Sequence, residues 1–331
     1  MGIKNLLKFL SEKPNIVKKI NLNEYNGKKI AIDISIVIYQ IVISIRNSGA
    51  DLTNKNGEIT SHILGLFNKT INFLEKGIIP IYVFDGKPPE LKNKVIDIRK
   101  QIKLKAIEKL KEAKTEGDRI KFFKRSVTIT RKQMNQCREL LKIMGIPYVD
   151  APEEADSQLS YLCRENMVYA VLTEDMDILT FGSPRIIRNL LSNKITPIEI
   201  ELSTILSNLN LNYDEFIELC ILFGCDYCSH INIKYNKIYE TYIKYKTIEK
   251  TIEELKLEGY HILNNFEYKK AKEYFKNYSY TPVIEDTLKL TKPDNNELLN
   301  LLVNKYGFIK FKLINKINKL VHYYDVFTTN K

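Results

Sequence analysis

Residues 145–182 run Gly-Ile-Pro-Tyr-Val-Asp-Ala-Pro-Glu-Glu-Ala-Asp, then a segment of helical character, then Met-Val-Tyr-Ala-Val-Leu-Thr-Glu-Asp-Met-Asp-Ile-Leu-Thr-Phe-Gly. Two short apolar runs in this stretch, 146–149 and 167–172, predict buried strands. A cluster of carboxylates follows each run: Glu153, Glu154 and Asp156 after the first, and Glu174, Asp175 and Asp177 after the second. Ligands of parallel sheets bind beyond the carboxyl ends of the strands, so these side chains are predicted to meet in one crevice.

Two further apolar runs also end in an aspartate: Lys29–Asp33 and residues 78–85. A single aspartate at a strand end is commonly a turn or cap residue, and acidic helix starts would explain either cluster alone. Acidic residues at the carboxyl ends of four predicted strands favour a binding site instead. Clustered carboxylates repel one another unless a cation neutralises them, and Mg²⁺ or Mn²⁺ suits oxygen ligands of this kind.

Length and composition allow one large α/β domain or two modest ones, because 331 residues with 44% hydrophobic content can bury a sizeable core. No apolar run is long enough to predict a membrane span. The N-terminus has no secretory signal, and Leu6 stands where an acylation motif requires Ser or Thr. We therefore expect an intracellular protein.

Five cysteines are an odd set, which argues for reduced thiols. The spacing of Cys220, Cys225, Cys228 and His230 is compatible with a zinc site. Against zinc, Cys220 lies in a predicted apolar helix over residues 216–223, and no second Cys-x-x-Cys occurs. Asp226, between two of the cysteines, is the more informative residue.

The net charge of +11 indicates a polyanionic partner. Residues 87–132 hold sixteen Lys or Arg against six Asp or Glu, a net of +10. Apolar residues at helical spacing in this segment (Ile98, Ile102, Leu104, Ile107 and Leu110) predict amphipathic helices with a basic face. A solvated charged helix pair is the alternative. If the basic face binds a partner instead of facing solvent, the basic residues directly after Asp85 would hold a phosphate backbone.

Nine motifs along the chain share their order with one known family: Met1-Gly2-Ile3, Ala-Ile-Asp33 with Tyr39, Thr60-Ser-His-Ile-Leu-Gly65, Tyr-Val-Phe-Asp-Gly-Lys-Pro-Pro89, Met-Gly-Ile-Pro-Tyr148, Asp-Ala-Pro-Glu-Glu-Ala155, Thr-Glu-Asp-Met-Asp177, Leu-Thr-Phe-Gly-Ser-Pro184 and Gly-Cys-Asp-Tyr-Cys228. They closely resemble the flap endonucleases, structure-specific 5′ nucleases of DNA replication and repair. The resemblance is strong over residues 1–230 and weak beyond. It implies an α/β fold with a mostly parallel central sheet flanked by helices. Residues 1–230 would form the nuclease core, with a basic helical arch inserted at about 87–132, and residues 231–331 a helical C-terminal DNA-binding region and tail.

The resemblance also implies two Mg²⁺ ions per active site, for which Mn²⁺ could substitute. Family assignments place one ion among Asp33, Asp85, Glu154 and Asp156, and the other among Asp175, Asp177 and Asp226. Asp175 is in addition expected to be catalytic. Asp156 stands where family members usually have Glu, so that its contact with the ion could pass through a water.

The family's catalytic Lys and Arg fall on Lys92 and Arg99. Their spacing of seven residues predicts one face of a helix, two turns apart, from which both could reach one scissile phosphate. A cation there would stabilise the charge that develops in the transition state. The resemblance further implies DNA contacts from Gly2, Tyr39, Arg46, Lys69, Glu154, Gly224, Asp226, Lys234 and Lys237.

One departure concerns the hairpin that grips duplex DNA in the family, where a Gly-Ile-Gly-Pro-Lys-Arg type of sequence is usual. The aligned residues 232–237 here read Asn-Ile-Lys-Tyr-Asn-Lys, without either glycine. Close approach of the backbone becomes harder without Gly. We expect duplex binding that is retained but more dependent on charge, and therefore more sensitive to salt.

The C-terminal part, 241–320, predicts helices at 247–255 and 297–306 that pack back on the core. Family members often end in a sliding-clamp motif; Leu320, Tyr323 and Tyr324 resemble its apolar part, but the glutamine is missing, and packing is the alternative. The function expected is Mg²⁺-dependent cleavage of branched DNA with a 5′ single-stranded flap, with 5′→3′ exonuclease activity, by a monomer in the nucleus or another site of DNA replication. A related nuclease for gaps, ends or recombination intermediates and a non-catalytic DNA-binding homologue are the alternatives.

Overall fold

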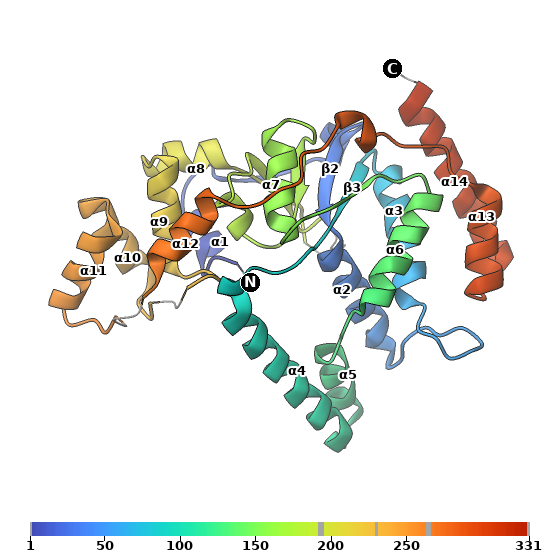
Figure 1. The fold of residues 1–331 in the computed structure, drawn as a ribbon, viewed down its shortest axis with the longest axis horizontal. Helices are drawn as coiled ribbons and strands as arrows, with labels where there is room; N and C mark the ends of the chain where they lie inside the picture. Colours follow the sequence, from blue (N-terminus) through green and yellow to red (C-terminus); the bar gives the residue numbers. More distant parts are fainter. Residues whose placement is uncertain (1, 191–194, 229–230, 263–265, 330–331) are drawn as a thin grey trace. The chain divides into compact units, whose positions relative to one another are not determined.

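The computed structural model describes residues 2–190, 195–228, 231–262 and 266–329 (Figure 1). The chain divides into two compact units, and each is described by itself below. The first unit comprises residues 1–20, 85–95 and 151–281; the second comprises residues 21–84, 96–150 and 282–331. Among the described residues, no helix is both long and apolar enough to span a membrane.

The first unit is built on four strands in the order β1-β7-β6-β5. Strands β5 and β6 are parallel, whereas β6 with β7 and β7 with β1 are antiparallel. Its elements are α1 (Leu6–Ser11), β1 (Val17–Lys19), η3 (Glu90–Lys92), α7 (Ala155–Arg164), β5 (Ala170–Leu172), η4 (Asp177–Leu179), β6 (Arg185–Arg188), β7 (Ile198–Glu201), α8 (Leu202–Leu209), α9 (Tyr213–Phe223), α10 (Tyr235–Tyr245), α11 (Ile248–Leu257) and α12 (Tyr268–Lys276).

The second unit is built on the parallel strands β2, β3 and β4. Their register pairs Asp33 with Val83 and Phe84 with Asp150. Its elements are η1 (Leu22–Tyr25), β2 (Lys29–Asp33), α2 (Ile34–Ile45), η2 (Arg46–Ser48), α3 (Ser61–Glu75), β3 (Ile79–Phe84), α5 (Glu116–Arg125), α6 (Arg131–Ile143), β4 (Tyr148–Asp150), η5 (Glu285–Leu288), α13 (Asn295–Leu299), the π-helical turn η6 (Asn300–Lys305) and α14 (Lys310–Thr329). Helix α4 (Asn93–Glu112) begins in the first unit and continues in the second.

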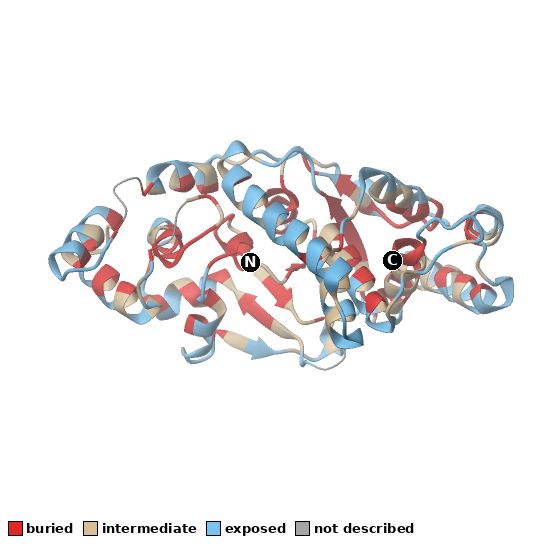
Figure 2. Cartoon of the chain, turned by 90° about the horizontal axis from the view of Figure 1, so that it is seen from below, coloured by how far each residue is buried: buried red, intermediate tan, exposed pale blue. Residues whose placement is uncertain are grey.

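The fold class expected from the sequence is confirmed. The described strands, in the order β1-β7-β6-β5 in the first unit and β2-β3-β4 in the second, form mixed, mostly parallel sheet structure with flanking helices. The predicted strand Lys29–Asp33 coincides with β2, and the other three predicted strands appear as β3, β4 and β5 with ends shifted by a few residues. Buried residues make up most of β2, β3 and β5, because parallel strands are covered on both faces; Figure 2 draws such strands in red.

The basic segment 87–132 forms helices α4 and α5, as predicted, and three of the apolar residues on α4 are exposed. Ile98 is 60% exposed, Ile102 58% and Leu104 44%, and α4 is mostly pale blue in Figure 2. Helical spacing predicts the helix correctly, whereas burial depends on a partner surface that spacing alone does not reveal. On α4, only Ala106 is buried among the described residues.

The C-terminal helices divide between the two units. Within the first unit, α10, α11 and α12 all contact α9. Within the second unit, α13 contacts α6 and α14 contacts α3, as Figure 1 shows for the red helices. The predicted helix at 297–306 is a short α-helix that passes into the π-helical turn η6. The division of the chain at residue 230 stays a prediction.

Candidate active site

The side chain of Lys92, at the end of η3, is buried among carboxylates of the first unit. Its ammonium forms an ion pair with the Glu154 carboxylate, and its Nζ lies 3.8 Å from Oδ2 of Asp226. The same Nζ lies 5.5 Å from the centre of the Tyr227 ring. Lys92 and Glu154 are each only 8% exposed. Three segments far apart in the sequence therefore meet at one buried charge cluster.

Glu154 is held from both sides of its carboxylate. Oε1 accepts from Lys92, and Oε2 accepts a hydrogen bond of 2.6 Å from the hydroxyl of Tyr227. The backbone around Glu154 is fixed as well, because Oδ1 of Asp85 accepts a hydrogen bond of 2.9 Å from the amide of Ala155 at the start of α7. An acidic side chain at this helix start also satisfies a free amide and complements the helix dipole.

Asp177, the first residue of η4, is the most deeply buried of the carboxylates, with 1% of its surface exposed. Burial and the nearby charge of Asp175 raise its pKa to about 7; Lys92 opposes this shift, and Asp226 and Glu154 add to it. Among the described residues, Oδ1 of Asp177 has no hydrogen-bond partner. The cluster is thus short of positive charge.

Gly2 lies against this orphaned oxygen. A Cβ atom built on Gly2 would stand 2.9 Å from Oδ1 of Asp177 and 3.0 Å from the amide nitrogen of Met176. Its φ of +75° also falls in the left-handed region that favours glycine. Gly2 therefore belongs to the same corner of the first unit as the acid cluster.

The charge of Lys92 depends on its acidic neighbours. Burial by itself would lower the pKa of the ammonium, but Glu154, Asp156 and Asp177 together raise it above its usual range. Lys92 is consequently a permanent cation inside the cluster. Asp156, one methylene shorter than Glu, is among the carboxylates that raise this pKa.

The donor chemistry of the cluster fits a divalent cation. Within the described ranges, no group of three or more His, Cys, Asp or Glu is already set to hold a metal ion. The partnerless oxygen of Asp177 and the raised pKa of that carboxyl nevertheless indicate an excess of negative charge that a hard cation would relieve. Glu154, Asp156, Asp177 and Asp226 are the residues of the cluster that would hold such an ion.

Asp33 belongs to the second unit, where it ends β2 and begins α2. Its Oδ1 accepts a hydrogen bond of 2.7 Å from the amide of Ser35, so it caps the helix while remaining 9% exposed. Tyr39 on α2, Lys69 on α3 and Arg99 on α4 are half-buried. Burial, with a smaller contribution from Lys76, lowers the pKa of Lys69 to about 8.

The guanidinium of Arg46 is engaged within the second unit. Nε and Nη2 bond the Asp51 carboxylate at 3.0 and 2.9 Å, and Nη1 donates to the carbonyl of Phe123 at 2.8 Å. The group also lies over the Phe123 ring, 4.1 Å from its centre. Arg46 thereby ties η2 to α5, and its predicted contact with DNA stays a prediction.

The prediction that Lys92 and Arg99 share one α-helix is wrong in part. Arg99 lies on α4, but Lys92 ends the 3-10 turn η3, and α4 begins only at Asn93. The Pro-Pro pair ending at Pro89 precedes this tight turn. A 3-10 turn at a helix start rotates side chains relative to an α-helix, so a spacing of seven no longer places both on one face.

The remaining predicted DNA contacts lie around α9 and α10. Gly224 ends α9, and its carbonyl accepts a hydrogen bond of 2.9 Å from the amide of Lys4. Lys234 is exposed and stands just before α10. Lys237 forms an ion pair with Glu258, with 2.5 Å between Nζ and Oε2, so a phosphate would have to compete with Glu258.

Two tyrosines of the site were missed from the sequence. Tyr227 holds Glu154, and its ring centre lies 4.7 Å from that of Tyr274, whose hydroxyl donates to Glu153 at 3.2 Å. The position of Tyr227 directly after Asp226 was the signal available for the first. Nothing local indicates Tyr274, which comes from α12.

Near Asp226, the sulfur atoms of Cys225 and Cys228 are 3.6 Å apart. Cys220 is fully buried on α9, as its predicted place on an apolar helix implies, and its thiol does not take part in a metal cluster among the described residues. His230 lies outside the described residues. It is therefore still the sequence that argues against a zinc site.

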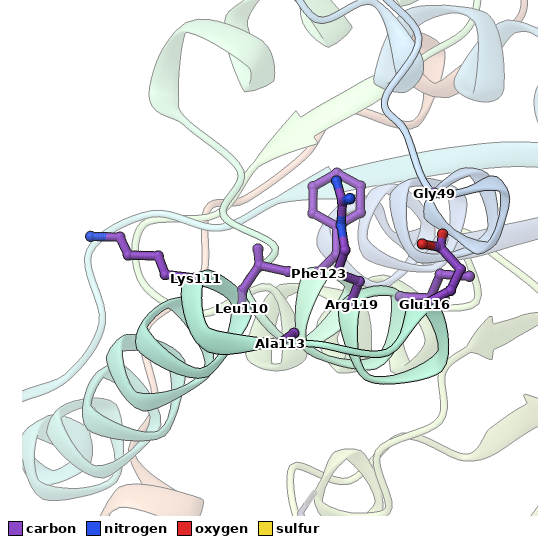
Figure 3. A pocket seen from close by; sticks show the side chains of 8 residues that line it. Gly49, Leu110, Lys111, Ala113, Glu116, Arg119 and Phe123 are labelled. Atoms are coloured by element: carbon purple, nitrogen blue, oxygen red, sulfur yellow. The ribbon is translucent and has the colours of Figure 1, made fainter.

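A separate pocket lies in the second unit, between Gly49 and the turn that joins α4 to α5. Figure 3 shows the Glu116 carboxylate pointing toward Gly49 and the side chain of Lys111 pointing away. None of the seven predicted ligand carboxylates lines it. The lining residues are Gly49, Leu110, Lys111, Ala113, Glu116, Arg119, Ile120 and Phe123.

Comparison with known proteins identifies the family. The model of the XPG N-terminal domain matches residues 1–106, and that of the XPG I-region matches residues 145–226. Flap endonuclease 1 of Glycine max is 42% identical over 330 residues, which covers 97% of this chain and 86% of that protein. Flap endonuclease 1-A of Oryza sativa subsp. japonica is 41% identical over 329 residues, with the same coverage of 97% and 86%.

Solved structures agree with this relationship. The flap endonuclease-1 from Methanococcus jannaschii has a TM-score of 0.73 and 35% identity, covering 97% of this chain and 99% of that one. The catalytic core of Rad2 in complex with a DNA substrate shares the fold, with a TM-score of 0.74 and 22% identity over 97% of this chain and 100% of that one.

The fold and the acid cluster, together with both XPG regions, define a structure-specific nuclease of the XPG class. Within that class, the chain belongs to the flap endonuclease family. It is a nuclease that acts on DNA in replication and repair, and its family depends on divalent metal ions.

Proposed function

We propose that this flap endonuclease cuts 5′ flaps near the junction with duplex DNA, has 5′→3′ exonuclease activity as well, and uses two Mg²⁺ ions. The observation that carries the proposal is the burial of Lys92 within the cluster of Glu154, Asp177 and Asp226. A nuclease needs both negative ligands for metal ions and a cation for the substrate phosphate, and this corner of the first unit supplies both.

The two ions are assigned to the seven carboxylates of the family motif. One belongs to Asp33, Asp85, Glu154 and Asp156, and the other to Asp175, Asp177 and Asp226. When bound, the ions would activate water and stabilise the leaving oxygen in an in-line attack on phosphorus. Because this chemistry needs no protein nucleophile, the role of the carboxylates is to hold charge, and Asp175→Ala is expected to abolish cleavage.

Two cations of the chain complete the proposed mechanism. Lys92 and Arg99 would neutralise the negative charge that develops on the scissile phosphate. Lys92 now pairs with Glu154 and Asp226, so it can move to a phosphate once other positive charge relieves those carboxylates. The hydroxyl of Tyr227 would keep Glu154 in place during that exchange, because its hydrogen bond uses the other carboxylate oxygen.

The DNA-binding surface proposed for the chain extends beyond the acid cluster. Its contacts are Gly2, Tyr39, Arg46, Lys69, Glu154, Gly224, Asp226, Lys234 and Lys237, of which Arg46 would act mainly by supporting α5. In place of a glycine hairpin, Lys234 would hold duplex phosphates as a point charge. Duplex affinity would then fall steeply with salt, and Lys234→Ala would reduce the slope of log affinity against log salt by about 1.

The proposed partner is branched DNA bound by a monomer at a site of DNA replication, such as the nucleus. A sliding clamp is the less supported partner. Leu320 is fully buried on α14, which leaves Tyr323 and Tyr324 as the half-exposed residues of that segment. Clamp recognition would therefore require either these tyrosines alone or a movement of α14.

Cleavage of a 5′-labelled double-flap DNA tests the proposal. Nicked, gapped and single-stranded DNA are the substrate controls, EDTA is the metal control, and Asp175→Ala is the site variant. Asp150→Ala is the matched protein control, since Asp150 is an aspartate at the end of β4 that is exposed and pairs with Arg138. Metal-dependent cutting at the junction that Asp175→Ala abolishes and Asp150→Ala retains is the expected result.

Other outcomes favour the alternatives. Preferential cutting of gapped DNA or ends would identify a related nuclease with a different substrate. Tight binding without cutting, in Mg²⁺ or in Mn²⁺, would leave the non-catalytic DNA-binding homologue.

A further inference from the structure

Two cysteines enclose the part of the chain that carries Asp226. Cys225 and Cys228 stand three residues apart in a turn that follows α9, and their sulfur atoms are in van der Waals contact at 3.6 Å. In a tight turn the Cα atoms of residues i and i+3 lie within about 7 Å, the range that a disulfide spans. The geometry of this Cys-x-x-Cys turn is therefore close to that of a disulfide.

We propose that Cys225 and Cys228 form a reversible disulfide, which makes this turn a redox modification site. Closing the bond requires the two sulfur atoms to approach by about 1.5 Å, since a disulfide bond is about 2.05 Å long. Rotation of the two side chains supplies that movement over so short a distance. The Cys-x-x-Cys spacing is also the one used by thiol–disulfide exchange proteins.

The two thiols differ in access, which sets the order of reaction. Cys228 is half-buried, whereas Cys225 is 8% exposed. Cys228 attacks a small disulfide oxidant such as glutathione disulfide, forms a mixed disulfide and releases one molecule of glutathione. Cys225 then attacks the Cys228 sulfur, closes the intramolecular bond and releases the second glutathione. Two protein thiols lose two electrons and two protons, and the oxidant gains both.

The other three cysteines lie in different surroundings. Cys137, Cys163 and Cys220 are buried at 0, 3 and 0% exposure. The thiol of Cys163 faces the backbone carbonyls of Tyr169 and Arg185, each 3.8 Å away, rather than another thiol. A small oxidant is therefore expected to react at the turn before it reaches these positions.

The disulfide would change the candidate active site, because Asp226 and Tyr227, the two residues between the cysteines, contact side chains of that site. Asp226 lies 3.8 Å from Lys92, and Tyr227 donates to Glu154. Closing the ring restricts the backbone of Asp226 and Tyr227 and shifts these contacts. The consequence for cleavage rests on the proposed function; formation of the bond does not.

Mass mapping of the full chain tests the bond directly. The protein is incubated with mixtures of oxidised and reduced glutathione, free thiols are alkylated, and proteolytic peptides are analysed. The expected product is a peptide that contains Cys225 and Cys228, has lost two hydrogen atoms and carries no alkyl group. Cys225→Ser should instead accumulate glutathione on Cys228, and Cys163→Ser, the control, should behave as the wild type. Glutathione retained on Cys228 of the wild type, oxidation at other cysteines first, or both thiols protected by co-purified zinc would overturn the proposal.

Flap cleavage by the oxidised protein is the second measurement. It should fall by at least about tenfold, the size of effect typical for groups that support metal ligands, and return with dithiothreitol. Cys228→Ser, which lacks the thiol that reacts first, should not respond to the oxidant. If the bond forms but the rate is unchanged, the effect on the site is refuted. If the reduced protein does not cleave flaps at all, the proposed function fails while the mapping result still decides the bond.

Discussion

Lys92 and Glu154 form an ion pair in which each residue is only 8% exposed. Breaking a buried pair by removing one partner is costly, because the remaining charge is left uncompensated. Lys92→Met keeps the side-chain length and removes the charge. In EDTA we expect it to lower the free energy of unfolding by about 3 kcal/mol. Mg²⁺ should then raise the melting temperature of the variant more than that of the wild type, since the ion replaces the missing positive charge.

Lys94→Met is the matched control for this measurement. Lys94 lies two residues further on, its side chain is 84% exposed, and it stands 3.9 Å from Glu267. An exposed pair of this kind contributes little to stability. Equal stability of the two variants in EDTA, or equal stabilisation by Mg²⁺, would contradict the idea that Lys92 compensates the acid cluster.

Gly2 offers a second test of the same corner. Gly2→Ala places a methyl group 2.9 Å from Oδ1 of Asp177, so cleavage should fall strongly while the fold is retained. Gly57→Ala is the control, because its φ of +76° is almost the same as the +75° of Gly2 but nothing lies within 4 Å of its Cβ. Both variants carry the backbone cost of about 1 kcal/mol for a left-handed residue. Thermal unfolding measures the backbone strain that both variants share, and flap cleavage measures the effect of the added methyl group on Asp177. Equal activity of both variants would contradict an effect of this contact on cleavage.

Arg46 is expected to act through the structure of the second unit. Arg46→Lys loses the bidentate bond to Asp51 and the bond to the Phe123 carbonyl, because an ammonium cannot reproduce the planar fork of a guanidinium. We expect a loss of about 2 kcal/mol in the free energy of unfolding and faster proteolysis within α5. Arg125→Lys, at an exposed position of the same helix, should change neither. If Arg46→Lys weakens DNA binding without affecting stability or proteolysis, a direct DNA contact is the better explanation.

The strands and their acidic ends could be predicted because their signals are local. A buried parallel strand is a continuous apolar run, and Lys29–Asp33 accordingly matches β2 to the residue. The acidic residues after the strands were found for the same reason. Glu154 and Asp177 both lie in the cluster, as their positions after predicted strands implied.

What the sequence did not show depends on contacts between distant residues. The pair of Lys92 with Glu154 joins positions 62 residues apart, and Arg46 bonds the backbone of a residue 77 positions away. No periodicity carries such information. Ile98 and Ile102 illustrate the converse, since their helical spacing correctly predicted the helix, whereas their exposure of 60% and 58% could not be predicted from that spacing.

His62 on α3 gives a prediction about pH that is independent of the active site. Its Nε2 lies 2.8 Å from Oε1 of Gln136, and within the described chain its Nδ1 has no hydrogen-bond partner. Burial lowers the pKa of His62 below its usual 6.5, although the bond to Gln136 opposes the shift. The folded protein therefore keeps the imidazole neutral at a pH where the unfolded chain binds a proton.

Because the unfolded state then binds more protons, the free energy of unfolding must fall as the pH drops below about 6.5, with a slope of at most about 1.4 kcal/mol per pH unit from this group. Above that pH the contribution of His62 is constant. Urea denaturation between pH 5 and 8 measures the slope, and His62→Gln should flatten it by up to one proton equivalent. His322→Gln, at an exposed position of α14, should leave the slope as it is in the wild type. A slope unchanged by His62→Gln would mean that other groups, and not the buried imidazole, set the acid sensitivity of the second unit.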